Sequence, residues 1–258
     1  MLLVRIILFY FYFICNYSVI IFIILNGVVM KRQKFLSNFI ISTMVLFVLC
    51  ASIFLPQSSF PVSTVGLPIY KGTSKDKVSL MINVYWGTEY IEPMLDVLDS
   101  YEIKTTFFLG GSWVERNHNE AREIVRRGHE VGNHGYFHKD HKALSRQANK
   151  NEILNCHKIV KSVLGVDMQL FAPPSGSFSA DTLDIAEEIG YNTIMWSLDT
   201  IDWRDKDVSL IIKRATEKAS GGDLILMHPT KETLEALPNI IDKLQVKGLT
   251  VTKVSEIL

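Results

Sequence analysis

The 258-residue sequence predicts an α/β domain of about seven parallel strands, preceded by one or two transmembrane segments. From residue 77 onward, short runs of β-branched and aromatic residues alternate with amphipathic stretches. Repeated strand and helix units of this kind form a parallel sheet with helical crossovers, either open or closed into a (β/α)-barrel. Residues 1–56 differ from the rest, because they are strongly apolar and contain no Asp or Glu.

Each expected strand is a short run of high β propensity, and a helix is expected after each strand except the last. In order, the strand runs are VSLMINVYW at 78–86, KTTFFLG at 104–110, HEVGNH at 129–134, MQLFA at 168–172, NTIMWS at 192–197, DLILM at 223–227 and TVTKV at 250–254. The amphipathic stretches between them predict helices at 90–101, 119–127, 143–164, 180–189, 206–219 and 231–246. Chemistry in such folds gathers where parallel strands end.

The apolar segments 6–29 and 35–56 are each long enough to cross a bilayer core, which takes ~20 residues. A basic cluster at 31–34 lies between them. One interpretation is a two-helix hairpin whose basic turn stays in the cytoplasm. The other is translation from Met30, because Met-Lys-Arg-Gln-Lys before an apolar run is typical of a secretory signal or signal-anchor. Residues 1–29 are then untranslated or form a second anchor.

The second interpretation divides the chain into 1–29, a signal peptide or signal-anchor at 30–56, a linker at 57–76 and a domain at 77–258. Both interpretations export the domain, because the basic cluster stays inside. No clear cleavage site precedes the linker. We therefore expect an extracytoplasmic domain, either anchored to the membrane or secreted.

Charge and cysteine content narrow the function classes. The chain has 27 Lys and Arg against 27 Asp and Glu, and four of the cations precede residue 57. The remainder is mildly acidic, which excludes a strongly basic nucleic-acid binder. Only one of the three cysteines, Cys156, lies in the expected domain, so an internal disulfide there is excluded. We expect Cys156 to be a buried apolar residue of its helix.

Three strand ends supply candidate catalytic residues. His134 and His138 follow the third strand, and their spacing predicts one face of a helical turn that reaches a single metal ion. Asp202 and Trp203 follow the fifth strand, and His228 follows the sixth. A carboxylate beside a histidine can orient it as a general acid. Because parallel strands end at one rim, we expect a single site.

Four segments carry a resemblance to a known family: KTTFFLGGSWVERN, REIVRRGHEVGNHGYFH, WSLDTIDW and LILMHP. From about Lys77 to Leu258 the chain resembles the polysaccharide deacetylases with NodB homology, carbohydrate esterase family four. The segment SLMINVYWGTEY is similar to the sporulation-associated, YlxY-like branch, of which PdaB-like proteins are cousins. The resemblance implies a distorted NodB-type barrel and a metal-dependent amide hydrolase. It also implies an N-acetylated cell-wall glycan as the substrate and a link to sporulation.

The resemblance also assigns roles by position. In that family Asp-His-His holds a divalent metal, usually zinc, a second Asp is the base, and a His on the opposite side protonates the leaving amine. By position, the resemblance gives His134 and His138 as metal ligands, His228 as the acid, Asp202 as its partner, and Trp203, Leu226 and Ser175 as substrate-binding residues.

The other half of the site departs from the family. Where the family has Thr-Phe-Asp-Asp-Gly, this chain places Asn83 at the base and Val84 at the metal ligand. Aligning Gly87 instead puts Tyr85 and Trp86 there and restores neither carboxylate. A further family motif, Arg-Pro-Pro-Tyr, also differs: Ala172 replaces the arginine that braces the base, and Ser175 stands in the place of the tyrosine.

These losses leave two functions open. Asn is a poor proton acceptor, and two histidines fall short of the three protein ligands of a catalytic zinc. Glu89 is either a replacement ligand or base, or a first-turn helix residue. Tyr85, Trp86 and Trp113 either stack on sugar rings or pack at the rim. The chain is thus a deacetylase, or an impaired one that binds glycan or acts as a wall scaffold, with zinc weakly held or absent.

Overall fold

The computed structural model describes residues 17, 39–47 and 66–258. The chain divides into two compact units, Met1–Val62 and Ser63–Leu258. The segments expected at 1–29 and 30–56 lie outside the described residues, apart from position 17 and the helical stretch 39–47. In the parts that are described, no helix combines the length and apolarity needed to cross a membrane.

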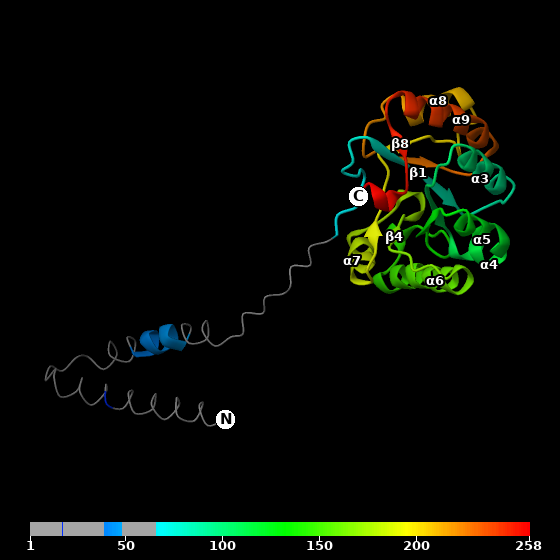
Figure 1. Ribbon diagram of the computed structural model, residues 1–258. Coiled ribbons are helices and arrows are strands. Elements are labelled where there is room, and N and C mark those ends of the chain that lie inside the picture. The colour runs from blue at the N-terminus through cyan, green and yellow to red at the C-terminus, as the bar shows by residue number, and fades with distance from the viewer. Residues whose placement is uncertain (1–16, 18–38, 48–65) are drawn as a thin grey trace. The chain divides into compact units, whose positions relative to one another are not determined.

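Parallel strands form the centre of the second unit (Figure 1). The strands are β1 (Lys77–Val84), β2 (Thr106–Leu109), β3 (Glu130–Asn133), β4 (Leu170–Phe171), β5 (Asn192–Thr193), β6 (Leu198–Asp199), β7 (Leu224–Met227) and β8 (Thr250–Val251). Seven of them follow the order β5-β4-β3-β2-β1-β7-β6, and β8 pairs with the start of β1. The outer strands β5 and β6 do not pair with each other. The predicted α/β class with about seven parallel strands is confirmed, in the form of a half-barrel.

The expected strand 192–197 is wrong as a single element. The chain forms β5, leaves the sheet, and returns at its opposite edge as β6. Between the two strands, Ile194 forms an isolated bridge with Ile69. A continuous apolar run conceals this break, because Ile194 is fully buried in the barrel interior without belonging to a strand.

Seven helices of the described domain surround the sheet (Figure 1). They are α3 (Ile91–Ser100), α4 (Gly111–Arg116), α5 (His118–Arg126), α6 (Arg146–Leu164), α7 (Ala180–Glu188), α8 (Val208–Thr216) and α9 (Lys231–Val246). Side chains of Ser145, Ser179, Asp207 and Thr230 accept backbone N–H bonds at the starts of α6, α7, α8 and α9. The short α4 was not expected, since its two leading glycines are typical of a loop.

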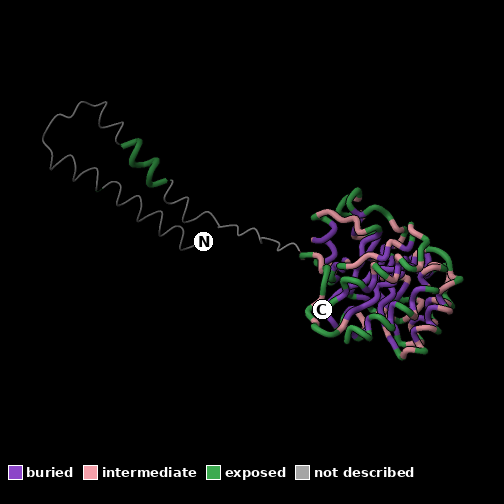
Figure 2. The backbone as a smooth tube through the Cα atoms, turned by 90° about the horizontal axis from the view of Figure 1, so that it is seen from above, coloured by how far each residue is buried: buried purple, intermediate pink, exposed green. Residues whose placement is uncertain are grey.

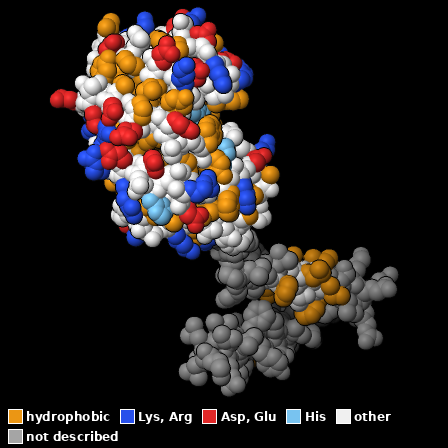
Figure 3. Space-filling view, turned by 90° about the vertical axis from the view of Figure 1, so that its right-hand side faces the viewer, with side chains coloured by type: hydrophobic (Ala, Val, Ile, Leu, Met, Phe, Trp, Pro, Cys, Tyr) orange, Lys and Arg blue, Asp and Glu red, His pale blue; other side chains and the backbone are white. Residues whose placement is uncertain are grey.

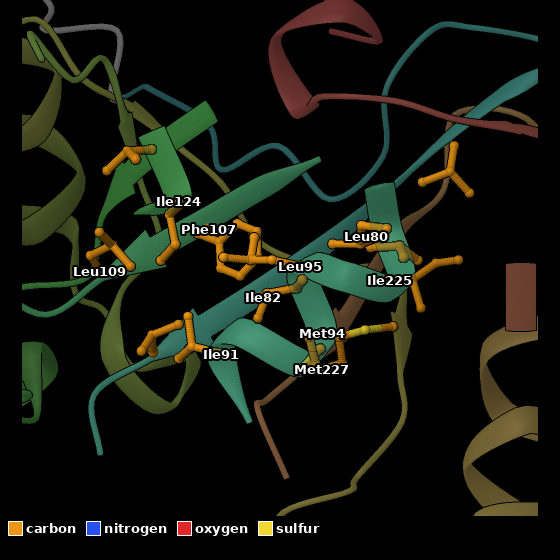
Figure 4. Close-up of a cluster of buried hydrophobic side chains, with 14 of the residues drawn as sticks. Leu80, Ile82, Ile91, Met94, Leu95, Phe107, Leu109, Ile124, Ile225 and Met227 are labelled. Atoms are coloured by element: carbon orange, nitrogen blue, oxygen red, sulfur yellow. The ribbon is translucent and has the colours of Figure 1, made fainter. Parts of the chain in front are cut away.

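Alternation along β1 separates two apolar layers. Leu80 and Ile82 pack between the sheet and the helices, where Figure 4 shows them beside Met94 and Leu95 of α3. Met81 belongs to a second cluster inside the barrel. Figure 2 shows the buried backbone running through the middle of the domain. Each of these side chains contributes about 1.5–3 kcal/mol by leaving water.

The folded domain begins before the expected boundary at residue 77. Residues 69–73 are bonded to distant parts of the chain: Lys71 bridges to Asp223, and the Thr73 N–H donates to the Ile257 carbonyl at 2.7 Å. The Lys71 ammonium also lies 2.8 Å from the buried Asp223 carboxylate. Residues 69–73, at the end of the expected linker 57–76, are therefore bound to the surface of the domain, and we call them the strap. Residues 57–65 lie outside the described part.

Charged side chains of both signs share the surface, as the face in Figure 3 shows. Arg127 is the centre of one network, because its guanidinium contacts Asp96, Asp99 and Glu123 at 2.6, 3.0 and 2.7 Å. Hydrogen bonds from Arg126 and then Arg127 lower the pKa of Glu123 to about 2. This network links α3 to α5 on the outside of the half-barrel.

Candidate active site

A cavity of about 300 Å³ lies where the strands end. It is lined by Asn83, Trp86, His134, His138, Ser175, Trp196, Asp199, Trp203, Leu226 and His228. The fold thus brings together most of the residues singled out in the sequence, from the ends of five strands, β1, β3, β4, β6 and β7. Trp196 and Asp199 are additional lining residues that the sequence did not single out, because the break between β5 and β6 was not expected.

The two histidines after β3 meet by a different geometry from the expected one. The stretch 134–138 is a loop, in which Gly135 and His138 have φ angles of 70° and 54°. The expected helical turn is therefore wrong. The rings of His134 and His138 nevertheless lie 5.1 Å apart between centroids. Left-handed backbone at two positions folds the loop back and turns both rings toward each other.

Hydrogen bonding fixes the form of His134. Its Nδ1 lies 2.7 Å from the carbonyl oxygen of Ala172, and a carbonyl only accepts, so Nδ1 carries the proton. Its Nε2 then keeps a lone pair. Burial, and next the neighbouring His138, hold the pKa of His134 well below its usual range. Burial also lowers the pKa of His138. Both rings are therefore neutral near pH 7, as metal ligands must be.

A buried carboxylate on α6 supports this loop. Glu152 accepts the backbone N–H groups of Tyr136 and Phe137 at 3.0 and 2.8 Å. The side-chain oxygen of Asn133 accepts the N–H of Gly135 at 2.9 Å. Sequence reasoning missed Glu152. The available signal was its place in the buried stripe of α6, one residue before Ile153, where a carboxylate needs a specific partner.

The acid half of the site is fully hydrogen-bonded. Asp202 Oδ1 lies 2.8 Å from His228 Nδ1, and its Oδ2 accepts from the His228 N–H and the Thr233 hydroxyl, both at 2.6 Å. Burial opposes the charged form of Asp202, yet the bonds from His228 and Thr233 outweigh it and lower the pKa of this carboxyl. Because Nδ1 donates to a carboxylate, His228 Nε2 is left for proton exchange at the cavity.

The end of β1 presents no carboxylate to this cavity. Asn83 lines it, whereas Val84 is fully buried in the layer between the sheet and the helices. The Tyr85 ring lies 4.7 Å from that of His138, and its hydroxyl donates to the Phe137 carbonyl. The Trp86 ring stacks 5.6 Å from that of His228 and lies 6.3 Å from that of His138. Tyr85 and Trp86 are therefore the β1-end residues beside the histidines, as the alignment on Gly87 implies.

Three other residues named in the sequence analysis lie away from the cavity lining. Glu89 is exposed, and its Oε2 accepts the N–H of Thr88 at 3.0 Å. The Ala172 side chain belongs to the cluster inside the barrel, and its carbonyl serves His134. Trp113 is almost completely buried and donates to the Gly87 carbonyl at 2.7 Å, so it supports the turn from beneath.

The donor set does not fit a catalytic zinc ion. Such a site uses three protein ligands, and here two imidazoles face Asn83 and Trp86. Within residues 39–47 and 66–258, no group of three His, Cys, Asp or Glu side chains is placed to hold a metal. The two imidazoles alone therefore do not assemble a catalytic zinc site. Cys156 offers no alternative nucleophile, because burial raises its pKa to about 12.

Comparisons with known proteins agree with this geometry. Residues 70–194 match the family described as polysaccharide deacetylase. The protein YlxY of Bacillus subtilis is 41% identical over 192 residues, which are 74% of this chain and 60% of YlxY. A peptidoglycan-N-acetylglucosamine deacetylase of Bacillus cereus is 32% identical, covering 66% of this chain and 82% of the enzyme.

Solved structures give the same match. A wild-type protein of Bacillus anthracis, described as a CE4 family pseudoenzyme, superimposes with a TM-score of 0.73 at 39% identity over 74% of this chain and 69% of that one. A mutant of that pseudoenzyme, described as having restored enzymatic activity, is 37% identical with the same TM-score, over 74% of this chain and 71% of the mutant. The chain spans 60% of the length of YlxY.

The opposite directions of Val84 and Trp86 predict a difference in stability. Val84→Asp should lower the free energy of unfolding by about 3 kcal/mol or more, because it buries an unpaired carboxylate. Trp86→Asp should cost less than about 1 kcal/mol, because the Trp86 side chain is 47% exposed. Urea denaturation of both variants measures this. A cost below about 1 kcal/mol for Val84→Asp would contradict the assigned direction of β1.

Proposed function

Because the chain belongs to the polysaccharide deacetylase family, we propose that it is a catalytically impaired member that binds N-acetylated cell-wall glycan. The observation that carries the proposal is the end of β1, where Asn83 and Trp86 face the histidine pair without a carboxylate. An amide and an indole neither remove a proton from water nor complete a zinc site.

Glycan binding is supported by the wall of the cavity. Trp86 and Trp203 are 47% and 54% exposed at its rim, and Leu226 lies in its lining. Exposed aromatic faces combine apolar area with a fixed shape, which suits the flat apolar faces of sugar rings. Ser175 and Asp199 add polar groups that can receive hydroxyls. Relatives named as peptidoglycan-N-acetylglucosamine deacetylases support the choice of glycan.

Residual hydrolysis is the second candidate, and a specific observation favours it. The Asp202 and His228 pair keeps the hydrogen bonds expected of a general acid and its partner. A protein that only binds glycan does not need this pair of Asp202 and His228, because the pair serves proton transfer. Turnover would still need a base, and the carboxylate that lines the cavity is that of Asp199.

The location of the protein is also a proposal. The acid-free segment 1–56 with its basic cluster at 31–34 supports export of the domain, either anchored or secreted. A role in sporulation rests on the resemblance of the β1 segment to the sporulation-associated branch. Unchanged spore formation after deletion of the gene would argue against that role.

Export predicts sensitivity to external protease. Protease added to intact protoplasts should digest residues 66–258 if they are anchored outside, or the domain should be recovered from the medium if it is secreted. A cytoplasmic protein of the same cells serves as the control. Full protection of a cell-associated domain, equal to that of the control, would contradict export.

Binding without turnover is the main prediction. The purified protein should sediment with N-acetylated peptidoglycan and release no acetate from it with or without added zinc. Trp203→Ala should reduce the bound fraction several-fold, since an aromatic contact of this type is worth about 1 kcal/mol. Val246→Ala, an exposed position on α9, is the matched control. Zinc-dependent acetate release by the wild type would favour the second candidate.

Zinc should bind weakly through the two histidines. Removing the charged ligand of a three-ligand site strips away much of the stabilisation of the cation. His134→Ala and His138→Ala should each abolish the binding measured by calorimetry, whereas exposed His118→Ala should leave it unchanged. If all three variants retained the wild-type zinc content, the metal would be bound elsewhere.

Restoring carboxylates should restore hydrolysis. Tyr85→Asp with Trp86→Asp and Ala172→Arg should release acetate from chitooligosaccharides at least tenfold faster than the wild type, or ~1.4 kcal/mol of barrier. A base misplaced by ~1 Å can cost ~100-fold, which is why the arginine is included.

The matched control for this repair places the two acids two residues earlier in the chain. Asn83→Asp with Val84→Asp and Ala172→Arg should gain little, because Val84 points into the core. The reverse result would assign the family's acidic pair to Asn83 and Val84. Equal activity of the wild type and both folded variants would contradict the damaged-site interpretation.

A further inference from the structure

A chain of hydrogen-bonded side chains connects the loop at 134–138 with the outer surface of the domain. Asn133 Oδ1 accepts the Gly135 N–H at 2.9 Å, and Asn133 Nδ2 donates to the Tyr191 hydroxyl oxygen at 3.2 Å. The same hydroxyl lies 2.5 Å from His157 Nδ1, and His157 Nε2 lies 3.3 Å from the Asp167 carboxylate. The chain thus starts at the loop that carries both cavity histidines and ends on an exposed residue.

Two main-chain groups fix the direction of the hydrogen bonds at Asn133. The Gly135 N–H only donates, so the amide oxygen must face it. The Ile153 carbonyl only accepts, so the amide nitrogen must face it, at 2.8 Å. The second N–H of this nitrogen therefore points at the Tyr191 oxygen, which acts as an acceptor there.

The direction continues through Tyr191 to His157. Tyr191 is almost completely buried, and burial raises the pKa of its hydroxyl, which therefore keeps its proton near pH 7. Because its oxygen accepts from Asn133, the hydroxyl proton needs an acceptor, and His157 Nδ1 is the one that lies within reach. Nδ1 is then the bare nitrogen of His157, and Nε2 carries a proton toward Asp167.

We propose that His157 is a positioning residue for His134 and His138, which acts from outside the cavity by holding Tyr191 and Asn133 in a single hydrogen-bonding direction. His157 does not line the cavity, and its own contacts are with Tyr191 and Asp167. This role concerns the loop itself, so it does not depend on the glycan proposed above.

Loss of the Nδ1 acceptor would disturb the loop through Tyr191. The buried hydroxyl would keep its proton without a partner, which is unfavourable. The side chain that still contacts it is Asn133, whose one acceptor is Oδ1. The hydroxyl would therefore compete with the Gly135 N–H for that oxygen. Gly135 has a φ of 70° directly after His134, so loosening it changes the turn between the two histidines.

The loop has a second anchor that does not involve His157. Glu152 accepts the N–H groups of Tyr136 and Phe137. The Gly135 amide therefore reports on the Asn133 anchor, whereas the next two amides report on the Glu152 anchor. A substitution that acts through the chain should affect the first amide and leave the other two unchanged.

The test measures amide hydrogen exchange of the full chain, residue by residue, by NMR at pH 7. His157→Phe keeps a ring of similar size, offers no acceptor and leaves little room for water. In this variant Gly135 should exchange at least ~5-fold faster, whereas Tyr136 and Phe137 should keep their wild-type rates. His157→Gln should restore the wild-type rate of Gly135, because its amide oxygen can accept from the Tyr191 hydroxyl.

A double substitution tests the route. Once Tyr191→Phe has removed the hydroxyl, adding His157→Phe should not change the exchange of Gly135 further. The exposed His118→Phe is the matched control and should leave all three amides unchanged. Urea denaturation confirms that each variant is folded.

Ring resonances give readouts that general stability does not move. In the wild type, ¹⁵N spectra should show the proton of His157 on Nε2 and that of His134 on Nδ1. The His138 ring lies 4.7 Å from the Tyr85 ring and 5.1 Å from the His134 ring, so a small displacement changes its resonances. These resonances should shift in His157→Phe and return in His157→Gln.

Three results would overturn the proposal. A proton on His157 Nδ1 in the wild type would reverse the direction of the chain, and this measurement needs no variant to fold. Equal acceleration of Gly135, Tyr136 and Phe137 in His157→Phe would mean that His157 acts through general packing. Wild-type exchange of Gly135 in His157→Phe would mean that the acceptor at His157 does not hold the loop.

Discussion

The alternation of side chains along β1 is the constraint on which the site depends. This strand lies between β2 and β7 and also pairs with β8, so its register sets the positions of the strands on both of its sides. Leu80, Ile82 and Val84 must face the helices to fill the outer layer. Asn83 then faces the interior, and a shift of one residue would exchange the two sets. The packing of Leu80, Ile82 and Val84 against the helices thus determines which β1 residues face the cavity.

The two halves of the cavity are held by separate networks, which explains how one can change while the other persists. Asp202 is fixed by bonds to His228 and Thr233, all within the segment from β6 to α9. The loop carrying His138 is fixed by Glu152 of α6. Neither network includes a side chain of β1. Replacing the residues at the end of β1 therefore leaves both carboxylates with all their hydrogen bonds, and the histidine loop loses only the bond from the Tyr85 hydroxyl to the Phe137 carbonyl.

The sequence was sufficient to predict most of the helices and strands, but not where each of them ends. Periodicity and turn residues predicted six helices and the parallel class, because long amphipathic helices and buried strands have strong patterns. It could not predict that the strand expected at 192–197 ends at Thr193 and that the chain rejoins the sheet at its opposite edge as β6, since Ile194 is as buried outside a strand as within one. It also missed α4, whose six residues are too few to show a period.

At the site, residue types were easier to predict than geometry. His134, His138 and His228 do line one cavity, since parallel strands end together. The helical turn between the first two was wrong because a positive φ at His138 has no reliable signature in a non-glycine residue. The sequence alone could not decide whether Asn83 and Val84, or Tyr85 and Trp86, occupy the positions of the family's acidic pair. Burial of Val84 in the outer layer separates them, because it shows which positions face inward.

The strap at residues 69–73 has a consequence for how a long polymer meets this domain. The strap contacts Asp223 and Ile257, at the end of the sheet where β7 begins, whereas the cavity lies where β7 ends. The bonds of Lys71 and Thr73 therefore lie at the pole opposite the mouth, whereas Ile69 bridges to Ile194 beside β5. A polymer can cross the mouth in either direction without breaking the bonds of Lys71 and Thr73.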